Sequence, residues 1–162
     1  MKSRPVDNFG MPPRLIDDTE IELEDGRAIG GGNFGSVMRA LIKDKLRPQD
    51  PDQYVVVVKV SHQPDLKAQL AEYDALKLVE PHPNLCGLVG HMIHADPGCP
   101  DVQTLRFVLP YLGGGSLEQR GAAWFRADVA RTVKATLDIL RGLEALGKAN
   151  LVHRDSTLDA MH

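Results

Sequence analysis

The sequence predicts an α+β fold, in which strands and one helix come first and further helices follow. Residues 54–60 hold five valines, whose branched side chains disfavour a helix, and this apolar run indicates a strand buried on both faces. Residues 65–79 carry apolar side chains at the spacing of an amphipathic helix. Residues from about 127 to 146 show such a stripe over a longer stretch: Val129, Val133, Leu137, Leu140, Leu143 and Leu146.

Length, charge and cysteine content limit the class of protein. The chain has 162 residues, enough for one domain with a core of its own. A net charge of −3 gives no basic field for nucleic acid, and no apolar stretch approaches the roughly 18 residues of a membrane span. The N-terminus lacks the apolar run of a secretory signal. Cys86 and Cys99 form no disulfide framework, so we expect reduced thiols in a cytoplasmic protein.

The first fifty residues contain loops and short strands. Residues 1–19 carry three prolines and no periodicity, which indicates a flexible N-terminal arm. Residues 21–24 alternate apolar and charged side chains, as a half-buried strand does, and a glycine-dense stretch follows at 30–35. Two prolines and two acids make 47–52 a loop. Residues 36–42 fit either a helical face with Val37, Leu41 and Lys45 or one side of a strand with Val37, Arg39 and Leu41.

The helix over residues 65–79 ends before two prolines. Two strands are expected after it, at 85–93 and 104–109, with a polar loop at 96–101 between them. The apolar face of the helix is expected to consist of Leu66, Leu70, Tyr73 and Leu76.

A glycine run at 113–115 marks a hinge-like break. Ser116 and Gln119 fit the capping box of a helix that begins there. Gly147 is placed to cap the long helix that ends near residue 146.

The stretch from Gly30 to Val37 matches the pattern G-x-G-x-x-G-x-V. Glycine lets the backbone lie close to phosphates, because no side chain stands between them. The same letters fit the glycine-rich loop of protein kinases, a dinucleotide-binding turn or a flexible turn, and the motif alone does not choose among them. No Gly-Lys-Ser/Thr follows, so it is not a Walker loop.

Three further motifs follow in order. Lys59 interrupts the valine run, and a lysine on a rigid strand near a glycine loop can bring a point charge to phosphates, although an isolated lysine there would be a surface residue. Residues 105–117 read as a strand, a glycine break and a helix start, as would any buried strand ending in a turn. Last comes His153-Arg154-Asp155, in which an aspartate can accept a hydroxyl proton, although such a run is also typical of a solvated turn.

Together with His82-Pro83-Asn84-Leu85, these motifs give residues 20–155 a resemblance to a eukaryotic-type protein kinase domain. Phe34 and the Ile21-Glu22-Leu23 lead-in look most like the tyrosine-kinase or tyrosine-kinase-like branch. The resemblance implies an N-lobe with an antiparallel sheet, one helix and the hinge at 20–112. It also implies a partial C-lobe at 113–162, with the first helices and the start of the catalytic loop.

The resemblance implies ATP as the nucleotide and a protein as the substrate. Lys59 would reach the ATP phosphates, and Glu72, 13 residues later (72 − 59), would hold it there; the His82 turn supports Glu72 over Asp74 and Glu80. Asp155 would be the catalytic aspartate that accepts the substrate proton. The implied nucleotide-binding residues, with Leu109 as gatekeeper and the hinge at 110–112, are Ile29, Gly30, Gly32, Asn33, Phe34, Gly35, Val37, Val57, Lys59, Leu109, Pro110 and Leu112.

The catalytic part departs from the family pattern. The family reads H-R-D-x-x-x-x-N, but the position five residues after Asp155 is Ala160, so the asparagine that holds a metal ion is missing. Thr157 stands where serine/threonine kinases have a lysine. No D-F-G follows, so Mg²⁺, which the family uses, lacks its protein ligands here, and we expect an incomplete chain that is inactive alone.

Three functions are compatible with parts of this pattern. The first is a protein kinase that transfers the ATP γ-phosphate to a protein hydroxyl of Ser/Thr or Tyr. The second is an inactive kinase-like fragment that binds nucleotide or a partner, since Lys59 and the glycine loop are intact while the metal residues are absent. The third, a dinucleotide-binding oxidoreductase, leaves His153-Arg154-Asp155 unexplained and lacks a βαβ unit with a suitably placed acid.

Overall fold

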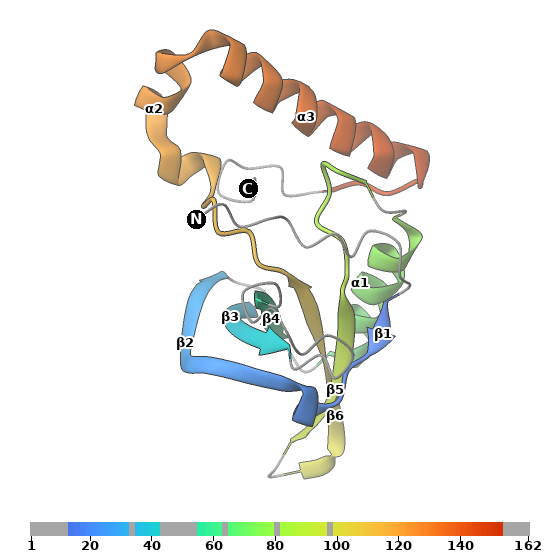
Figure 1. The fold of residues 1–162 in the computed structure, drawn as a ribbon. Helices are drawn as coiled ribbons and strands as arrows, with labels where there is room; N and C mark the ends of the chain where they lie inside the picture. The colour runs from blue at the N-terminus through green and yellow to red at the C-terminus, as the bar shows by residue number, and fades with distance from the viewer. Residues whose placement is uncertain are drawn as a thin grey trace. The chain divides into compact units, whose positions relative to one another are not determined.

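A computed structural model describes residues 13–32, 35–42, 55–62, 65–79, 82–96 and 99–153 of the chain (Figure 1). The chain forms two compact units. The first consists of Met1–Leu78 and Gly87–Tyr111, and the second of Val79–Cys86 and Leu112–His162. No helix among the described residues is long and apolar enough to cross a membrane.

The first unit is built on a six-stranded sheet with the order β1-β5-β6-β4-β3-β2. Strands β2 to β6, which lie within the predicted N-lobe of residues 20–112, pair antiparallel as expected. Strand β1, which precedes that range, pairs in parallel with β5. A short 3-10 helix, η1 (Asp18–Glu20), lies between β1 and β2. The strands are β1 (Arg14–Leu15), β2 (Ile21–Gly32), β3 (Gly35–Ile42), β4 (Val55–Ser61), β5 (Gly90–Asp96) and β6 (Cys99–Pro110).

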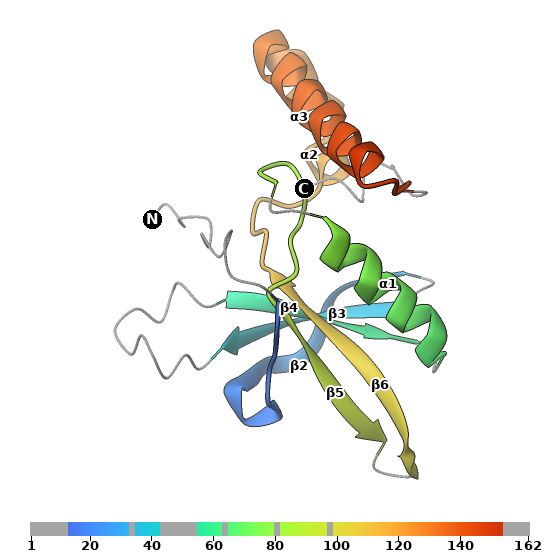
Figure 2. The ribbon, with the colours of Figure 1, turned by 90° about the vertical axis from the view of Figure 1, so that its right-hand side faces the viewer.

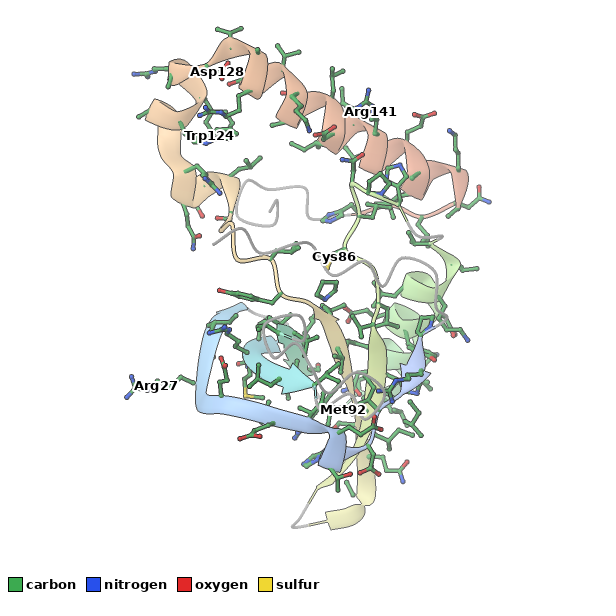
Figure 3. The ribbon with its side chains drawn as sticks, viewed as in Figure 1. Arg27, Cys86, Met92, Trp124, Asp128 and Arg141 are labelled. Atoms are coloured by element: carbon green, nitrogen blue, oxygen red, sulfur yellow. The ribbon has the colours of Figure 1, made fainter. Side chains whose placement is uncertain are left out.

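Strand β4 is buried on both faces, as its valine run predicts. Val56 and Val58, which point to one face, are 2% and 1% exposed, and Val57 on the other face is 8% exposed. Val56 and Val58 belong to a cluster on one face of the sheet, whose other buried members are Ile16, Ala40, Val108 and Met92, the last of which is labelled in Figure 3. The core of this unit therefore has a layer on each side of β4.

Helix α1 (Leu66–Leu78) covers the opposite face of the sheet, where Figure 2 shows it running beside β5 and β6. Tyr73 and Leu76 pack there, as expected, against the buried Leu88, Leu105 and Phe107. The expected apolar face is wrong at its N-terminal half, because Leu66 and Leu70 are exposed.

Gln69 takes the buried position on α1 instead, with an exposed fraction of 3%. Its Oε1 accepts a hydrogen bond from the backbone N–H of Leu105 at 2.7 Å. The paired residues of β4 and β6 end at Val60 and Arg106, so this N–H has no strand neighbour on that side and needs another acceptor. A polar side chain is buried here because it satisfies the backbone.

The predicted flexible arm is wrong for its last residues. Arg14 and Leu15 form β1, and Ile16 is 2% exposed in the core cluster. The Ile16 N–H donates to the His91 carbonyl oxygen at 2.9 Å, which continues the pairing with β5. Residues 1–12 of the predicted arm lie outside the described residues.

Several boundaries differ from the sequence-based expectation. Residues 36–42, for which helix and strand were both open, form β3, and β2 continues from the predicted strand into the glycine run. Strand β5 begins at Gly90 rather than 85, although the Val89 N–H already donates to Val108. Strand β6 begins at Cys99, inside the predicted loop, because its pairing with β5 extends that far.

The second unit contains α2 (Leu117–Ala127) and α3 (Val129–Lys148). The predicted capping box at Ser116 is confirmed, since the Ser116 side chain accepts from the Gln119 N–H and the Gln119 side chain accepts from the Ser116 N–H. The predicted cap at Gly147 is wrong. Helix α3 continues through Lys148, Ala149 is its C-cap, and Asn150 takes the left-handed conformation with φ of 56°.

Helix α3 packs closely against the turn of residues 82–85 at Gly142, which is buried. A Cβ at this position would lie 2.7 Å from the Asn84 carbonyl oxygen and 3.2 Å from the Leu85 Cδ2. In contrast, the apolar stripe of α3 is largely exposed, from 37% to 73%, at Val129, Val133, Leu137, Leu140 and Leu143.

Substituting the two helical glycines of α3 should give opposite results. Gly142→Ala should lower the free energy of unfolding by about 1–3 kcal/mol, because the added methyl group meets backbone. Gly147→Ala should raise it by about 0.5–1 kcal/mol, because no atom of the described part of the chain lies within 4 Å of the new Cβ and alanine favours a helix. Urea denaturation followed by circular dichroism measures both. Equal effects of the two substitutions would contradict the close packing at Gly142.

Candidate functional site

A row of paired residues crosses four strands of the first unit. Gly30 on β2 lies opposite Val37 on β3, Val37 lies opposite Lys59 on β4, and Lys59 lies opposite Phe107 on β6. Directly opposite residues project from the same face of a sheet. Phe107 belongs to the cluster that α1 covers, so Lys59 and Val37 also project from that face.

Lys59 and Glu72 form the contact expected from the sequence. The Lys59 Nζ lies 2.6 Å from the Glu72 Oε1, and the two side chains are 28% and 42% exposed. Glu72 lies three residues after Gln69, on the same side of α1. Asp74, a competing acid in the sequence, is exposed, and Glu80 lies outside the described residues. The lysine ammonium is therefore held over the α1 face of the sheet.

The three motif glycines have different surroundings. A Cβ at Gly35 would lie 2.5 Å from the Val60 carbonyl oxygen, so this position requires glycine for the pairing of β3 with β4. Among the described residues, no atom lies within 4 Å of a Cβ at Gly30 or Gly32, so packing in this part of the chain does not require glycine there. Ile29, before them, is 52% exposed. Asn33 and Phe34, at the tip of the motif, lie outside the described residues.

A second row lies beside Lys59 on the same face. Val57 pairs with Arg39 on β3 and with Leu109 on β6. Val57 is buried and Leu109 is half-buried, so they present an apolar surface next to the lysine. Pro110 is the last residue of β6. In the second unit, Leu112 is 45% exposed.

The contacts of Arg39 are not indicated by any motif in the sequence. Its guanidinium lies 5.0 Å from the centre of the Tyr111 ring, and its Nη1 lies 3.0 Å from the Glu24 Oε2. The alternation of Val37, Arg39 and Leu41 indicates a shared side of a strand but not a partner for the arginine.

The Tyr73 ring on α1 lies 4.7 Å from the His91 ring on β5. Burial, and secondarily the positive charge of Lys77, lowers the pKa of His91. This favours the neutral imidazole, which packs beneath the helix without an uncompensated charge. The contact adds to the attachment of α1 by Gln69 and Glu72.

The His82 turn and the His153 motif lie in the second unit. The His82 Nδ1 accepts from the Asn84 N–H at 3.2 Å, so this histidine stabilises the turn that packs on α3. His153 is the last described residue, and Arg154, Asp155 and Ala160 lie outside the described part of the chain. Within that part, no three His, Cys, Asp or Glu side chains gather in a way that could hold a metal ion.

Known protein kinases resemble this chain over most of its length. The family model described as protein tyrosine and serine/threonine kinase matches residues 23–159. The chain is 30% identical to a tyrosine-protein kinase receptor TYRO3 of Danio rerio over 80% of the chain and 15% of that protein. It is 28% identical to TYRO3 of Xenopus laevis over 96% of the chain and 19% of that protein. The chain thus spans less than a fifth of the length of these curated relatives, and it belongs to the protein tyrosine and serine/threonine kinase family.

Proposed function

We propose that this chain binds ATP as part of a protein kinase that transfers the γ-phosphate to a protein hydroxyl. The ion pair of Lys59 and Glu72 carries this proposal, because Lys59 lies in the same row of strand residues as Gly30 and Val37. A lysine held by a glutamate next to open glycines can bind phosphate oxygens as a fixed point charge. The ion pair with Glu72 holds the Lys59 ammonium in this position.

The second row supplies the place for the base. Val57 and Leu109 offer an apolar surface beside Lys59, where a flat aromatic base can bind. By family register the Pro110 carbonyl accepts a hydrogen bond from adenine and the Leu112 N–H donates one. Gly30 and Gly32 leave room for phosphates, because neither has a side chain and no atom of the described residues lies within 4 Å of a Cβ position there.

Asp155 is assigned to the chemical step by its place in the sequence. It accepts the proton of the substrate hydroxyl as the oxygen bonds to the γ-phosphorus and ADP leaves. The Ala160 side chain has no oxygen with which to bind a cation, so it does not fit the role of the metal-binding asparagine of the family, and no step is assigned to Mg²⁺. Similarity to tyrosine-protein kinase receptors favours tyrosine as the substrate residue. The cytoplasmic location stays a prediction.

Replacing Lys59 tests the nucleotide site. Lys59→Met should weaken ATP binding by about 10–100-fold, because a charge-assisted contact to phosphate is lost. Lys67→Met is the matched control, since Lys67 is exposed on the same helix as Glu72 and should bind ATP like the unaltered chain. Isothermal titration calorimetry measures both dissociation constants. ATP binding that is unchanged by Lys59→Met would remove Lys59 from the site.

Two glycine substitutions should separate ligand binding from stability. Gly32→Ala should weaken ATP binding without changing the melting temperature, because its Cβ meets no atom of the described residues. Gly35→Ala should lower the free energy of unfolding by about 1–3 kcal/mol, because its Cβ meets the Val60 carbonyl. Thermal denaturation and calorimetric titration report the two properties. A large loss of stability in Gly32→Ala with normal binding would contradict the assignment of this loop.

A second candidate function is a kinase-like module that binds nucleotide without transferring phosphate. The observation that favours it is Ala160 at the position of the metal-binding asparagine. We expect the 162-residue chain to give only background incorporation from radiolabelled ATP into a generic protein substrate with Mg²⁺ or Mn²⁺. Phosphate transfer by the chain that is abolished by Asp155→Asn would contradict this second function and support catalysis by the chain itself.

A further inference from the structure

Arg39 connects three parts of the first unit. Arg39 lies on β3, and its Nη1 lies 3.0 Å from the Glu24 Oε2 on β2. Its guanidinium lies 5.0 Å from the centre of the ring of Tyr111, the residue that directly follows β6. An arginine over an aromatic ring is attracted by the negative face of the ring. The three residues therefore form a chain of contacts, Glu24–Arg39–Tyr111, which runs from the edge strand β2 to the end of β6.

This chain of contacts borders the proposed base site. Arg39 lies opposite Val57, and Val57 lies opposite Leu109, in the row next to that of Lys59. The side chain of Arg39 thus projects from the same face as the residues assigned to adenine. Tyr111 follows Pro110, whose carbonyl is assigned to the base.

The position of the guanidinium is set by its two partners. The side chains of Arg39 and Glu24 are 40% and 31% exposed, so the pair is partly withdrawn from water. The Arg39 Nε is buried and has no hydrogen-bond partner among the described residues. Glu24 holds one end of the guanidinium, and the flat cation is left to cover the Tyr111 ring.

We propose that Arg39 is a positioning residue for the base of the nucleotide. By holding the Tyr111 ring, it fixes the backbone on which the Pro110 carbonyl lies and so favours adenine over a base with a different hydrogen-bonding edge. This role rests on the proposed nucleotide function. It assigns Arg39 no contact with the transferred phosphate.

The test compares ATP with GTP, which share the triphosphate and differ in the base. Arg39→Met should weaken ATP binding by about five- to tenfold and GTP binding by less than about twofold, so the preference for ATP falls. Arg39→Lys keeps a cation for Glu24 and the ring and should give an intermediate ATP affinity. Tyr111→Leu should reproduce the loss, and adding Arg39→Met to it should change little more, because both act through one contact.

Arg27→Met is the matched control. Arg27 is exposed on β2, and Figure 3 shows its side chain pointing away from the strand. The Arg27→Met variant should bind ATP and GTP with the same affinities as the unaltered chain. Displacement of a fluorescent nucleotide by ATP and GTP measures all the affinities. If Arg39→Met does not fold, Arg39→Lys and Tyr111→Leu provide the same comparison.

The outcomes separate this inference from the proposed function. If the unaltered chain binds neither ATP nor GTP, the proposed nucleotide function fails and the role of Arg39 fails with it. If the unaltered chain binds ATP, only the role of Arg39 would be overturned by equal weakening of both nucleotides or by unchanged binding in Arg39→Met. A lower ATP preference with additive effects of Arg39→Met and Tyr111→Leu would also overturn it.

Discussion

Burial of strand β4 on both faces is the constraint on which the first unit depends. Alternation sends Val56 and Val58 to one apolar cluster and Val57 and Lys59 to the face that α1 covers. If β4 slipped by one residue in its pairing, its side chains would exchange faces and the Lys59 side chain would point into the apolar cluster. An unpaired ammonium there is costly, so the valines and the lysine specify the same register. The place of the proposed phosphate-binding charge is thus set by the packing of the core.

Helix α1 adds the second half of that constraint. Its apolar contribution is modest, since Tyr73 and Leu76 pack while Leu70 is exposed. Its place is specified by polar groups, because Gln69 accepts from the Leu105 N–H and Glu72 pairs with Lys59. The first contact satisfies a backbone N–H beyond the pairing of β4 with β6, and the second pairs the charge of the Lys59 side chain. The helix is therefore matched to one position along β6.

Local patterns predicted the elements whose signals are local. The valines of β4, the stripe of α3 and the capping box at Ser116 each depend on neighbouring residues, and the structure contains all three. The sequence predicts an arm at Ile16, because the β5 edge that it joins lies far away in sequence. Residue type alone predicts a cap at Gly147, whereas Asn150 takes the left-handed conformation.

The candidate site was predictable where a family motif names a residue type at a fixed spacing, as for Lys59 and Glu72. It was not predictable where two distant side chains meet without such a motif. The contact between Arg39 and Tyr111 joins residues 72 positions apart (111 − 39), and nothing near either residue indicates the other. The same is true of Gln69, whose acceptor role appears only once β6 is known to extend past the end of β4.

The two polar attachments of α1 differ in their response to ionic strength. A neutral amide that accepts from a backbone N–H is almost insensitive to dissolved salt, whereas the partly exposed pair of Lys59 and Glu72 is screened by it. Added salt therefore loosens one attachment and leaves the other, only three residues away, intact. Tyr73 and Leu76 keep helix α1 packed on the sheet, so the change is confined to the side-chain pair. The orientation of the lysine becomes a property of the solution as well as of the sequence.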